Sequence, residues 1–223
     1  MAGAGGDEAG MARRPQVRHA ERLVGVTGEG GKAGWRARLR AARRELGPDD
    51  LAAAADALRS HVLGRLAGAG RVAAYVPVGR EPGSVELLDA LRDGGTEVLL
   101  PVLVPGGGLD WAAFRGGGDL VAGALGTREP AGPRLGPDAL GAADAVLVPA
   151  LGVDRLGTRL GRGGGYYDRA LARLGSAVLV AALLHDGELV DRLPRDPWDR
   201  PVAAAVTPGG GWTRLPVVEH HGG

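Results

Sequence analysis

The sequence predicts an α/β fold, a single domain with a mostly parallel sheet flanked by helices. Strand-like apolar runs alternate along the chain with segments of helical periodicity, which is the order that builds a parallel sheet. Two runs, residues 145–153 and 176–183, are apolar almost throughout, as expected of strands that are covered on both faces. The length of 223 residues suits one domain of ordinary size.

Two helices are predicted near the start of the domain. The basic segment over residues 32–46 favours a helix, and Asp49 or Asp50 is expected to cap a second one. The apolar positions of the second helix recur with a period near 3.6 residues, and they are Leu51, Ala55, Leu58, Val62 and Leu66. Residues 1–31, which are rich in Gly and Ala and lack periodicity, predict a disordered extension.

The middle of the chain predicts a strand, a helix and a second strand. Residues 71–76 favour the first strand, and Ser84 is expected to cap a helix that runs to Leu91 and ends at a Gly-Gly pair. Residues 96–100 favour the second strand, which Pro101 is expected to stop.

The remaining elements are shorter. Residues 105–137 are predicted to be rich in loops, with a short strand over residues 109–112. Beyond the two apolar strands, residues 203–206 favour a last short strand.

Composition excludes several classes of function. The 27 basic and 26 acidic residues leave a formal net charge of +1, so we expect no broad basic surface for nucleic acid or a membrane. The absence of cysteine excludes disulfides and thiolate metal sites. The longest apolar run, residues 177–184, is too short to span a bilayer as a helix, and the N-terminus has no secretory signal. We expect a cytoplasmic protein, a monomer or weak dimer, with its domain over residues 32–216 and a tail over 217–223.

A glycine-rich stretch carries the strongest functional signal. Residues 159–169 read Arg-Leu-Gly-Arg-Gly-Gly-Gly-Tyr-Tyr-Asp-Arg, after a predicted strand and before the helical pattern of residues 170–174. Glycines let a backbone approach a phosphate, and a helix N-terminus favours an anion there. Asp168 adds a carboxylate that suits a hard cation such as Mg²⁺ beside the phosphate. The stretch therefore predicts phosphate or nucleotide chemistry, although glycines alone are also compatible with a flexible turn.

The stretch matches neither of two common phosphate-binding motifs. A Walker A loop needs Gly-Lys-Ser/Thr after the glycines, whereas Tyr166 and Tyr167 follow here. A dinucleotide fingerprint starting at Gly161 meets Tyr166 where a third small residue is required.

Charged residues elsewhere each allow two interpretations. Helical spacing places four cations on one face of the first helix, either as a grip on a polyanion or as a solvated surface; they are Lys32, Arg36, Arg40 and Arg43. Glu81 follows a strand and would either bind donor groups of a heterocycle or cap the next segment. The loop residues Asp154, Asp196 and Asp199 would either share a metal or form turns.

Several of these features occur together in one family. The chain resembles the 5-formyltetrahydrofolate cyclo-ligases, also called methenyltetrahydrofolate synthetases. The resemblance rests on Val148–Asp154 followed by the glycine-rich stretch, on Lys32 and Arg36 in a Lys-x-x-x-Arg motif, and on Tyr75-Val76-Pro77 through Glu81-Pro82. It also includes the Trp198-Asp199 turn and runs in order from about Lys32 to Pro208.

The resemblance implies the family's fold and an ATP-dependent ring closure, in which 5-formyltetrahydrofolate gives 5,10-methenyltetrahydrofolate, ADP and phosphate. Phosphorylation of the formyl oxygen turns it into a good leaving group, so that the neighbouring folate nitrogen can attack the formyl carbon. Catalysis is then mainly positioning and charge neutralisation.

The resemblance also implies residue roles. The ATP-binding residues would be Lys32, Arg36, Arg159, Leu160, Gly161, Arg162, Gly163, Gly164, Gly165, Tyr166 and Tyr167. The folate-binding residues would be Arg36, Val76, Glu81, Arg162, Gly163, Gly164, Gly165 and Tyr166. Asp168 and Asp199 would hold Mg²⁺, and Arg162 and Tyr166 would be catalytic, with Arg162 stabilising charge on the moving phosphoryl group.

The chain departs from the family pattern at three positions. Trp35 replaces an aliphatic residue, Gly164 stands where some members carry Lys, and Trp198 stands where His is frequent. Two alternatives to the enzyme stay open on sequence: a non-catalytic nucleotide- or folate-binding protein of the same fold, and a different ATP-dependent kinase or ligase.

Overall fold

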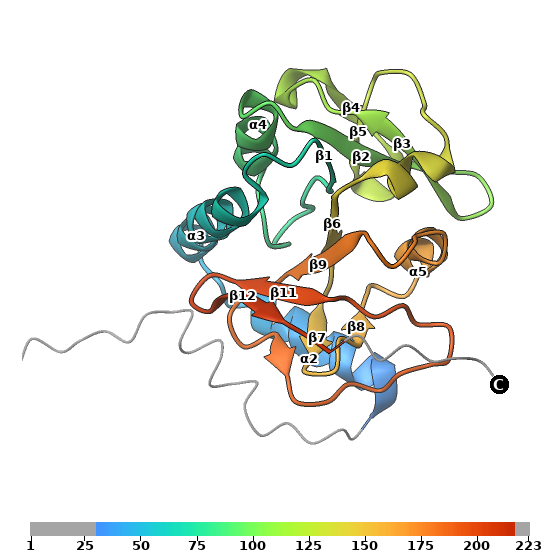
Figure 1. The fold of residues 1–223 in the computed structure, drawn as a ribbon. Helices are drawn as coiled ribbons and strands as arrows, with labels where there is room; N and C mark the ends of the chain where they lie inside the picture. Colours follow the sequence, from blue (N-terminus) through green and yellow to red (C-terminus); the bar gives the residue numbers. More distant parts are fainter. Residues whose placement is uncertain (1–29, 217–223) are drawn as a thin grey trace, which may run out of the picture.

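The central feature of the fold is a seven-stranded sheet with the order β12-β11-β9-β6-β1-β2-β3 (Figure 1). The computed structural model describes residues 30–216. The strands of this sheet are β1 (Arg71–Ala73), β2 (Glu97–Val104), β3 (Gly108–Ala113), β6 (Ala145–Pro149), β9 (Leu179–Leu183), β11 (Ala204–Thr207) and β12 (Gly211–Arg214). The pairs from β11 to β2 are parallel, and only the edge pairs β2·β3 and β11·β12 are antiparallel. The predicted α/β fold with a mostly parallel sheet is confirmed.

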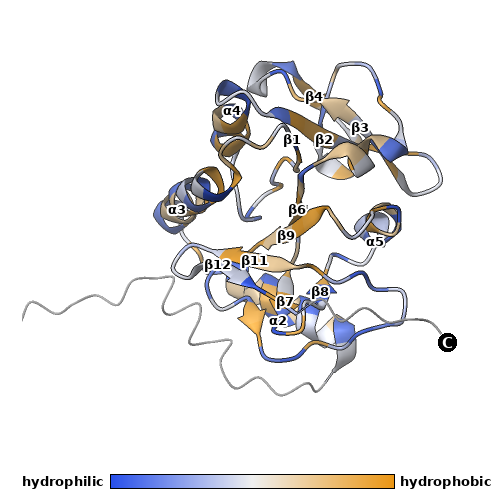
Figure 2. Ribbon diagram, viewed as in Figure 1, coloured by the Kyte–Doolittle hydropathy of each residue, from blue (hydrophilic) through white to orange (hydrophobic). Residues whose placement is uncertain are grey.

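The strands are apolar in succession because alternate residues enter two different cores. Val72 and Leu147 pack into a cluster with α3 (Pro48–Leu66) and α4 (Val85–Asp93). Their neighbours Ala73 and Val146 face the opposite side and pack with α5 (Tyr166–Leu171) and the 3₁₀ segment η3 (Pro137–Ala142). Figure 2 shows the resulting hydrophobic strands between helices with polar outer faces.

A smaller layer carries the first helix, α2 (Gly31–Arg44). The strands β10 (Leu189–Val190), β7 (Gly152–Asp154) and β8 (Arg159–Leu160) form a three-stranded sheet. Figure 1 shows α2 beside β7 and β8. Trp35, Leu39 and Ala42 of α2 pack in one cluster with Leu160 and Val190 of this sheet. A separate hairpin, β4 (Leu120–Ala122) and β5 (Arg128–Pro130), includes the 3₁₀ segment η2 (Ala124–Gly126); η1 (Gly117–Asp119) precedes it.

Four strand predictions were wrong in extent. The strand expected over residues 71–76 ends at Ala73, and the one expected over residues 176–183 begins at Leu179. The strand expected over residues 145–153 ends at Pro149, and the chain then turns into β7 of the smaller sheet. The strand expected to stop at Pro101 continues through it to Val104. Proline has no N–H to donate to a neighbouring strand. It is tolerated at position 101 because β1 pairs with β2 only at residues 97–99, so no hydrogen bond to β1 is lost there.

The helix starts show one error and one confirmation. Asp49 and Asp50 do not cap α3, which begins at Pro48 after Gly47. Asp50 lies in the first turn and accepts a hydrogen bond from the Gly47 N–H at 2.9 Å. Ser84 caps α4 as predicted, because its hydroxyl oxygen accepts from the Leu87 N–H at 3.2 Å.

Two further expectations concern the ends of the chain and membranes. The predicted extension falls almost entirely on residues 1–29, and this part and the tail over 217–223 lie outside the described residues. Between residues 30 and 216, no helix is long and apolar enough to cross a membrane.

Candidate active site

A cavity of about 760 Å³ lies at the carboxyl ends of the parallel strands β1 and β6. Tyr75 and Val76 follow β1, Pro149 ends β6 and Ala150 follows it, and all four residues line the cavity. This edge of an open α/β sheet is where ligands ordinarily bind.

The glycine-rich loop, residues 161–165, forms one wall of the cavity between β8 and α5. Gly163 has φ 111° and Gly165 has φ 66°, which are left-handed conformations that favour glycine. A side chain at Gly164 would place its Cβ 2.6 Å from the Tyr166 ring. The loop therefore requires glycine for its shape, and the flexible-turn interpretation does not account for these constraints.

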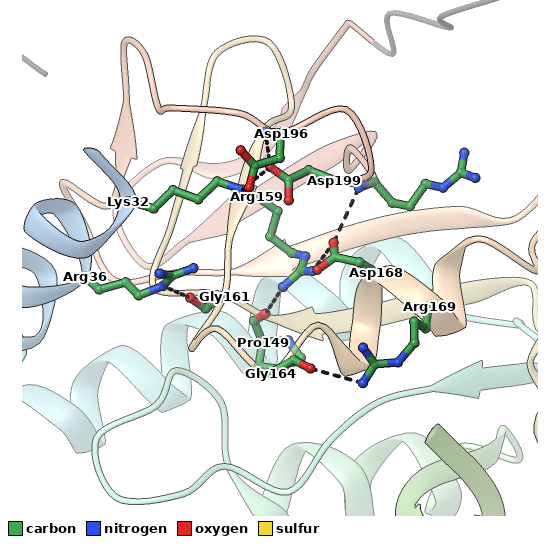
Figure 3. Close-up of polar contacts among 11 residues, drawn as sticks. Lys32, Arg36, Pro149, Arg159, Gly161, Gly164, Asp168, Arg169, Asp196 and Asp199 are labelled. Atoms are coloured by element: carbon green, nitrogen blue, oxygen red, sulfur yellow. Dashed lines mark hydrogen bonds and ion pairs between the residues drawn. The ribbon is translucent and has the colours of Figure 1, made fainter. Parts of the chain in front are cut away.

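Arginines from both flanking helices hold the carbonyls of this loop. Arg36 Nε of α2 donates to Gly161 O at 3.0 Å, and Arg40 Nη2 donates to Arg162 O at 3.3 Å. Arg169 Nη2 of α5 donates to Gly164 O at 3.0 Å (Figure 3). The loop therefore has positive charge on both sides.

Lys32 contacts two carboxylates at the mouth of the cavity. Its Nζ lies 2.6 Å from Asp196 Oδ2 and 2.6 Å from Asp199 Oδ2 (Figure 3). Burial by itself lowers the pKa of Lys32, but the hydrogen bonds and charges of the two carboxylates outweigh it and raise the pKa above its ordinary value. Lys32 is therefore a cation at physiological pH.

A second ion pair, Arg159 with Asp168, lies deeper. Arg159 Nη2 is 2.7 Å from Asp168 Oδ1, and the Arg159 side chain is only 3% exposed. Arg159 Nη1 also reaches the Pro149 carbonyl at the end of β6, at 3.5 Å (Figure 3). Arg159 Nε is buried with no hydrogen-bond partner among the described residues. Buried donors of this kind are normally satisfied, so this one fits a site that takes an anionic ligand.

The donor set fits a Mg²⁺ ion that completes its shell with phosphate oxygens and water. Asp168 and Asp199 both line the cavity, and the contacts described above use only one oxygen of each carboxylate. Over residues 30–216, no three His, Asp or Glu side chains gather as a metal cage. Mg²⁺ bound by one or two carboxylates and a substrate phosphate does not need such a cage.

Glu81 marks the opposite side of the cavity. Its Oε1 lies 2.9 Å from Arg162 Nη2, and its Oε2 accepts from the Val78 N–H at 2.9 Å. The Glu81 side chain is 10% exposed, whereas that of Arg162 is 52% exposed. Arg162 is therefore free of steric confinement and can exchange partners when a ligand enters.

The cavity also has an apolar part between β2, β3 and η2. Pro101, Leu103, Leu109 and Leu125 contribute to it, beside Val76. Such a mixture of apolar surface and a few polar groups suits the flat ring of a small molecule.

All the residues to which the family resemblance assigns a role line this one cavity, although their roles stay predictions. Of the four cations on α2, Lys32 and Arg36 line it, Arg40 holds the loop, and Arg43 is buried elsewhere. Asp154 forms a turn instead, since its carboxylate accepts from three backbone N–H groups.

Several lining residues were missed by sequence reasoning. Leu103, Leu125, Thr127 and Arg128 come from β2, η2 and the β4–β5 hairpin. The hairpin strands are three residues each, too short for a clear alternation, so no signal identified them.

Comparison with known proteins gives a consistent result. Residues 29–208 match the model of the 5-formyltetrahydrofolate cyclo-ligase family. A 5-formyltetrahydrofolate cyclo-ligase of Mycolicibacterium smegmatis is 44% identical over 169 residues, which cover 72% of this chain and 85% of that protein. One of Escherichia coli K12 is 33% identical over 144 residues, covering 63% of this chain and 79% of that protein.

Solved structures show the same fold. The NMR structure of Aquifex aeolicus 5,10-methenyltetrahydrofolate synthetase superposes with a TM-score of 0.71 at 30% identity, covering 85% of this chain and 97% of the other. A 5,10-methenyltetrahydrofolate synthetase of Mycoplasma pneumoniae shares the fold at a TM-score of 0.63 and 19% identity, covering 78% and 96%.

Proposed function

The chain belongs to the 5-formyltetrahydrofolate cyclo-ligase family and is an enzyme of that activity, and from this premise we propose that the cavity beside the glycine-rich loop is where it closes the folate ring with ATP. The observation that carries the proposal is that two cation–carboxylate groups, the loop and Glu81 meet in a single cavity. The cation–carboxylate groups and the loop suit a polyphosphate with its metal ion. Glu81 suits a heterocycle that carries N–H donors.

The chemistry explains why both substrates must meet. A formamide oxygen is a poor leaving group, and its carbonyl draws in the nitrogen lone pair. Transfer of the γ-phosphoryl group to that oxygen makes an iminium-like phosphate ester. The neighbouring folate nitrogen then attacks the formyl carbon and loses its N–H proton to solvent, and phosphate leaves with the original formyl oxygen as the carbon–oxygen bond breaks. The protein has to align the two reactants and to neutralise charge.

Lys32, Arg36 and the loop would hold the triphosphate. Arg36 already contacts the loop through the Gly161 carbonyl at 3.0 Å, and Lys32 lines the same cavity. Arg159, buried and with one unpartnered N–H, would meet a phosphate oxygen. The remaining loop-wall residues of the proposed ATP site are Leu160, Gly161, Arg162, Gly163, Gly164, Gly165, Tyr166 and Tyr167.

Asp168 and Asp199 would hold Mg²⁺. Bound there, the ion would neutralise phosphate oxygens during transfer. A neighbouring cation orients each carboxylate, Arg159 for the first and Lys32 for the second.

Glu81 would accept hydrogen bonds from ring N–H groups of the folate, with Val76 and the apolar part of the cavity against the ring face. Binding there displaces Arg162 from Glu81, because both compete for the same carboxylate. The released guanidinium reaches the γ-phosphoryl group and stabilises its developing charge. Tyr166, which also lines the cavity, would position the formyl group, and Gly163, Gly164 and Gly165 would allow close approach of the backbone.

The test is a direct assay of the purified protein with Mg-ATP and 5-formyltetrahydrofolate. We expect absorbance of 5,10-methenyltetrahydrofolate to rise, with one ADP formed per product and no product without ATP. Nucleotide binding without product would instead favour a non-catalytic binding protein of this fold. The cytoplasmic location and the monomeric or weakly dimeric state stay predictions.

A further inference from the structure

A buried ion pair outside the cavity holds the helix that carries Lys32 and Arg36. Arg43 of α2 donates from Nε to Glu188 Oε1 at 2.6 Å and from Nη2 to Glu188 Oε2 at 2.8 Å. The two side chains are 6% and 0% exposed. Arg43 Nη2 also donates to the Ala150 carbonyl at 2.6 Å, and Ala150 lines the cavity. The pair therefore lies directly behind the cavity wall.

Arg43 lies on the same stripe of α2 as the two cavity cations. It follows Lys32 by 11 residues and Arg36 by 7, which correspond to about three and two helical turns. Trp35 and Leu39 of α2 make apolar contacts with the smaller sheet. Arg36 and Arg40 each donate one hydrogen bond to a carbonyl of the glycine-rich loop. Apolar contacts are non-directional, whereas a two-bond arginine–carboxylate pair fixes both rotation and position.

The same pair connects to the loop that carries Glu81. Glu188 Oε2 accepts from the His185 N–H at 2.9 Å, and His185 Nε2 donates to the Arg80 carbonyl at 3.1 Å. Arg80 Nη1 in turn donates to the Arg43 carbonyl at 3.2 Å. The backbone on either side of the cavity is thus bound to one buried group.

Stability alone does not explain this pair. Desolvation of two charges costs about as much as their attraction returns, and apolar residues of similar volume often fold as well or better. We propose that Arg43 and Glu188 are positioning residues of the cyclo-ligase reaction, which set the rotation of α2 and so aim Lys32 and Arg36 at the ATP phosphates. This inference rests on the proposed function, since it assumes that those two cations bind ATP.

The test uses Glu188→Gln in the full chain, with nucleotide binding measured by calorimetry using Mg²⁺ and a non-hydrolysable ATP analogue. Gln has nearly the same volume, but one of its two terminal atoms is an NH₂ group, which donates. Gln therefore cannot accept all of the hydrogen bonds that the two Glu188 oxygens accept from Arg43 and His185. We expect the dissociation constant to rise about tenfold or more, because small misplacements of binding groups are costly. The matched control is Leu58→Ala, a fully buried residue of α3, which lowers stability but leaves nucleotide affinity unchanged.

Coupling to Lys32 distinguishes aiming from general loosening. If Lys32 and Glu188 affected nucleotide binding independently, the fold-changes of their substitutions would multiply. If Glu188 acts through α2, Lys32→Met weakens nucleotide binding less in the Glu188→Gln protein than in the wild type. Each single variant raises the nucleotide dissociation constant by some factor. We expect the product of these two factors to be about fivefold larger than the factor measured for the double variant.

Each of three results would overturn the proposal. The folded Glu188→Gln protein could bind nucleotide with wild-type affinity, or the fold-changes of the two single variants could multiply to that of the double variant within about twofold. The third such result is a loss of nucleotide affinity in Leu58→Ala as large as that in Glu188→Gln. If Glu188→Gln does not fold, Arg43→Lys replaces it, because Lys keeps the charge and loses the second bond; the same outcomes apply. Because the readout is binding, a wild type that binds nucleotide with this coupling but makes no product would refute the proposed reaction and leave the positioning role standing. A wild type that binds no nucleotide would refute both.

Discussion

Asp168→Asn changes the charge of one carboxylate and almost nothing of its shape. Asp168 Oδ1 lies 2.7 Å from Arg159 Nη2 and accepts weakly from the Arg200 N–H at 3.4 Å. Asn keeps an acceptor oxygen at this position but leaves the Arg159 guanidinium, 3% exposed, without an anionic partner.

The structure bounds the cost to stability. Removing one partner of a fully buried ion pair costs about 3–5 kcal/mol. Asp168 is 21% exposed and Asn retains a hydrogen bond, so we expect a smaller loss of about 1–2 kcal/mol. For a domain of this size that loss lowers the melting temperature by roughly 2–8 °C.

The cost to activity should be much larger. Loss of a residue that merely supports a metal ligand already costs about 10–100-fold, so we expect loss of a direct ligand to lower turnover by at least about 100-fold. The assay is turnover as a function of Mg²⁺ concentration, together with thermal unfolding. Asp138→Asn is the matched control, because that carboxylate pairs with Arg173 on the surface and is 85% exposed. A folded Asp168→Asn protein with the wild-type Mg²⁺ dependence would refute the metal assignment.

The remaining predictions concern other parts of the cavity. Arg36→Ala should weaken ATP binding about 10- to 100-fold by calorimetry, the loss of one charged contact, and an unaltered dissociation constant would argue against the α2 contribution. Arg162→Ala should lower kcat about 10²–10³-fold with little change in KM for ATP. A rise in KM of the same size with kcat unchanged would make Arg162 a binding residue instead. Chelation of divalent metal should stop turnover, and Mg²⁺ should restore it; undiminished turnover in chelator would exclude a metal role. Burial, and then the charge of Glu81, raise the pKa of Tyr75 well above its ordinary value. The neutral Tyr75 hydroxyl therefore contributes its full stability below about pH 10, which is the pKa of Tyr in the unfolded chain. Above that pH the free energy of unfolding falls by about 1.4 kcal/mol per pH unit. Urea unfolding between pH 8 and 11 should show this slope reduced in Tyr75→Phe; an identical slope would contradict the burial argument.

Local patterns were sufficient to predict much of the fold. The central strands of the main sheet were predictable because both of their faces are covered, so their residues are apolar in succession, as at Ala145–Pro149. The edge strand β12, Gly211–Arg214, was not predicted. The cavity residues were predictable because the glycine-rich stretch and its neighbours form contiguous motifs that the parallel sheet brings to one edge.

Features that depend on tertiary contacts were not predictable. The strands β7, β8 and β10 have three, two and two residues, so no alternation is visible in them. In the sequence, Arg43 has the same helical spacing as the other cations of α2, so nothing distinguished it from them. Its partner Glu188 lies 145 residues away in the chain, on a loop. Only the folded chain shows that Arg43 is buried in an ion pair, whereas Lys32 and Arg36 line the cavity.

In the proposed reaction, the γ-phosphoryl group of ATP is transferred to the formyl oxygen within this cavity. The most direct measurement is turnover of 5-formyltetrahydrofolate labelled with ¹⁸O in the formyl group, followed by mass analysis of the released phosphate. We predict that each phosphate carries the labelled oxygen, because that oxygen leaves with the phosphoryl group. Unlabelled phosphate from ATP that is consumed in step with ring closure would contradict the account.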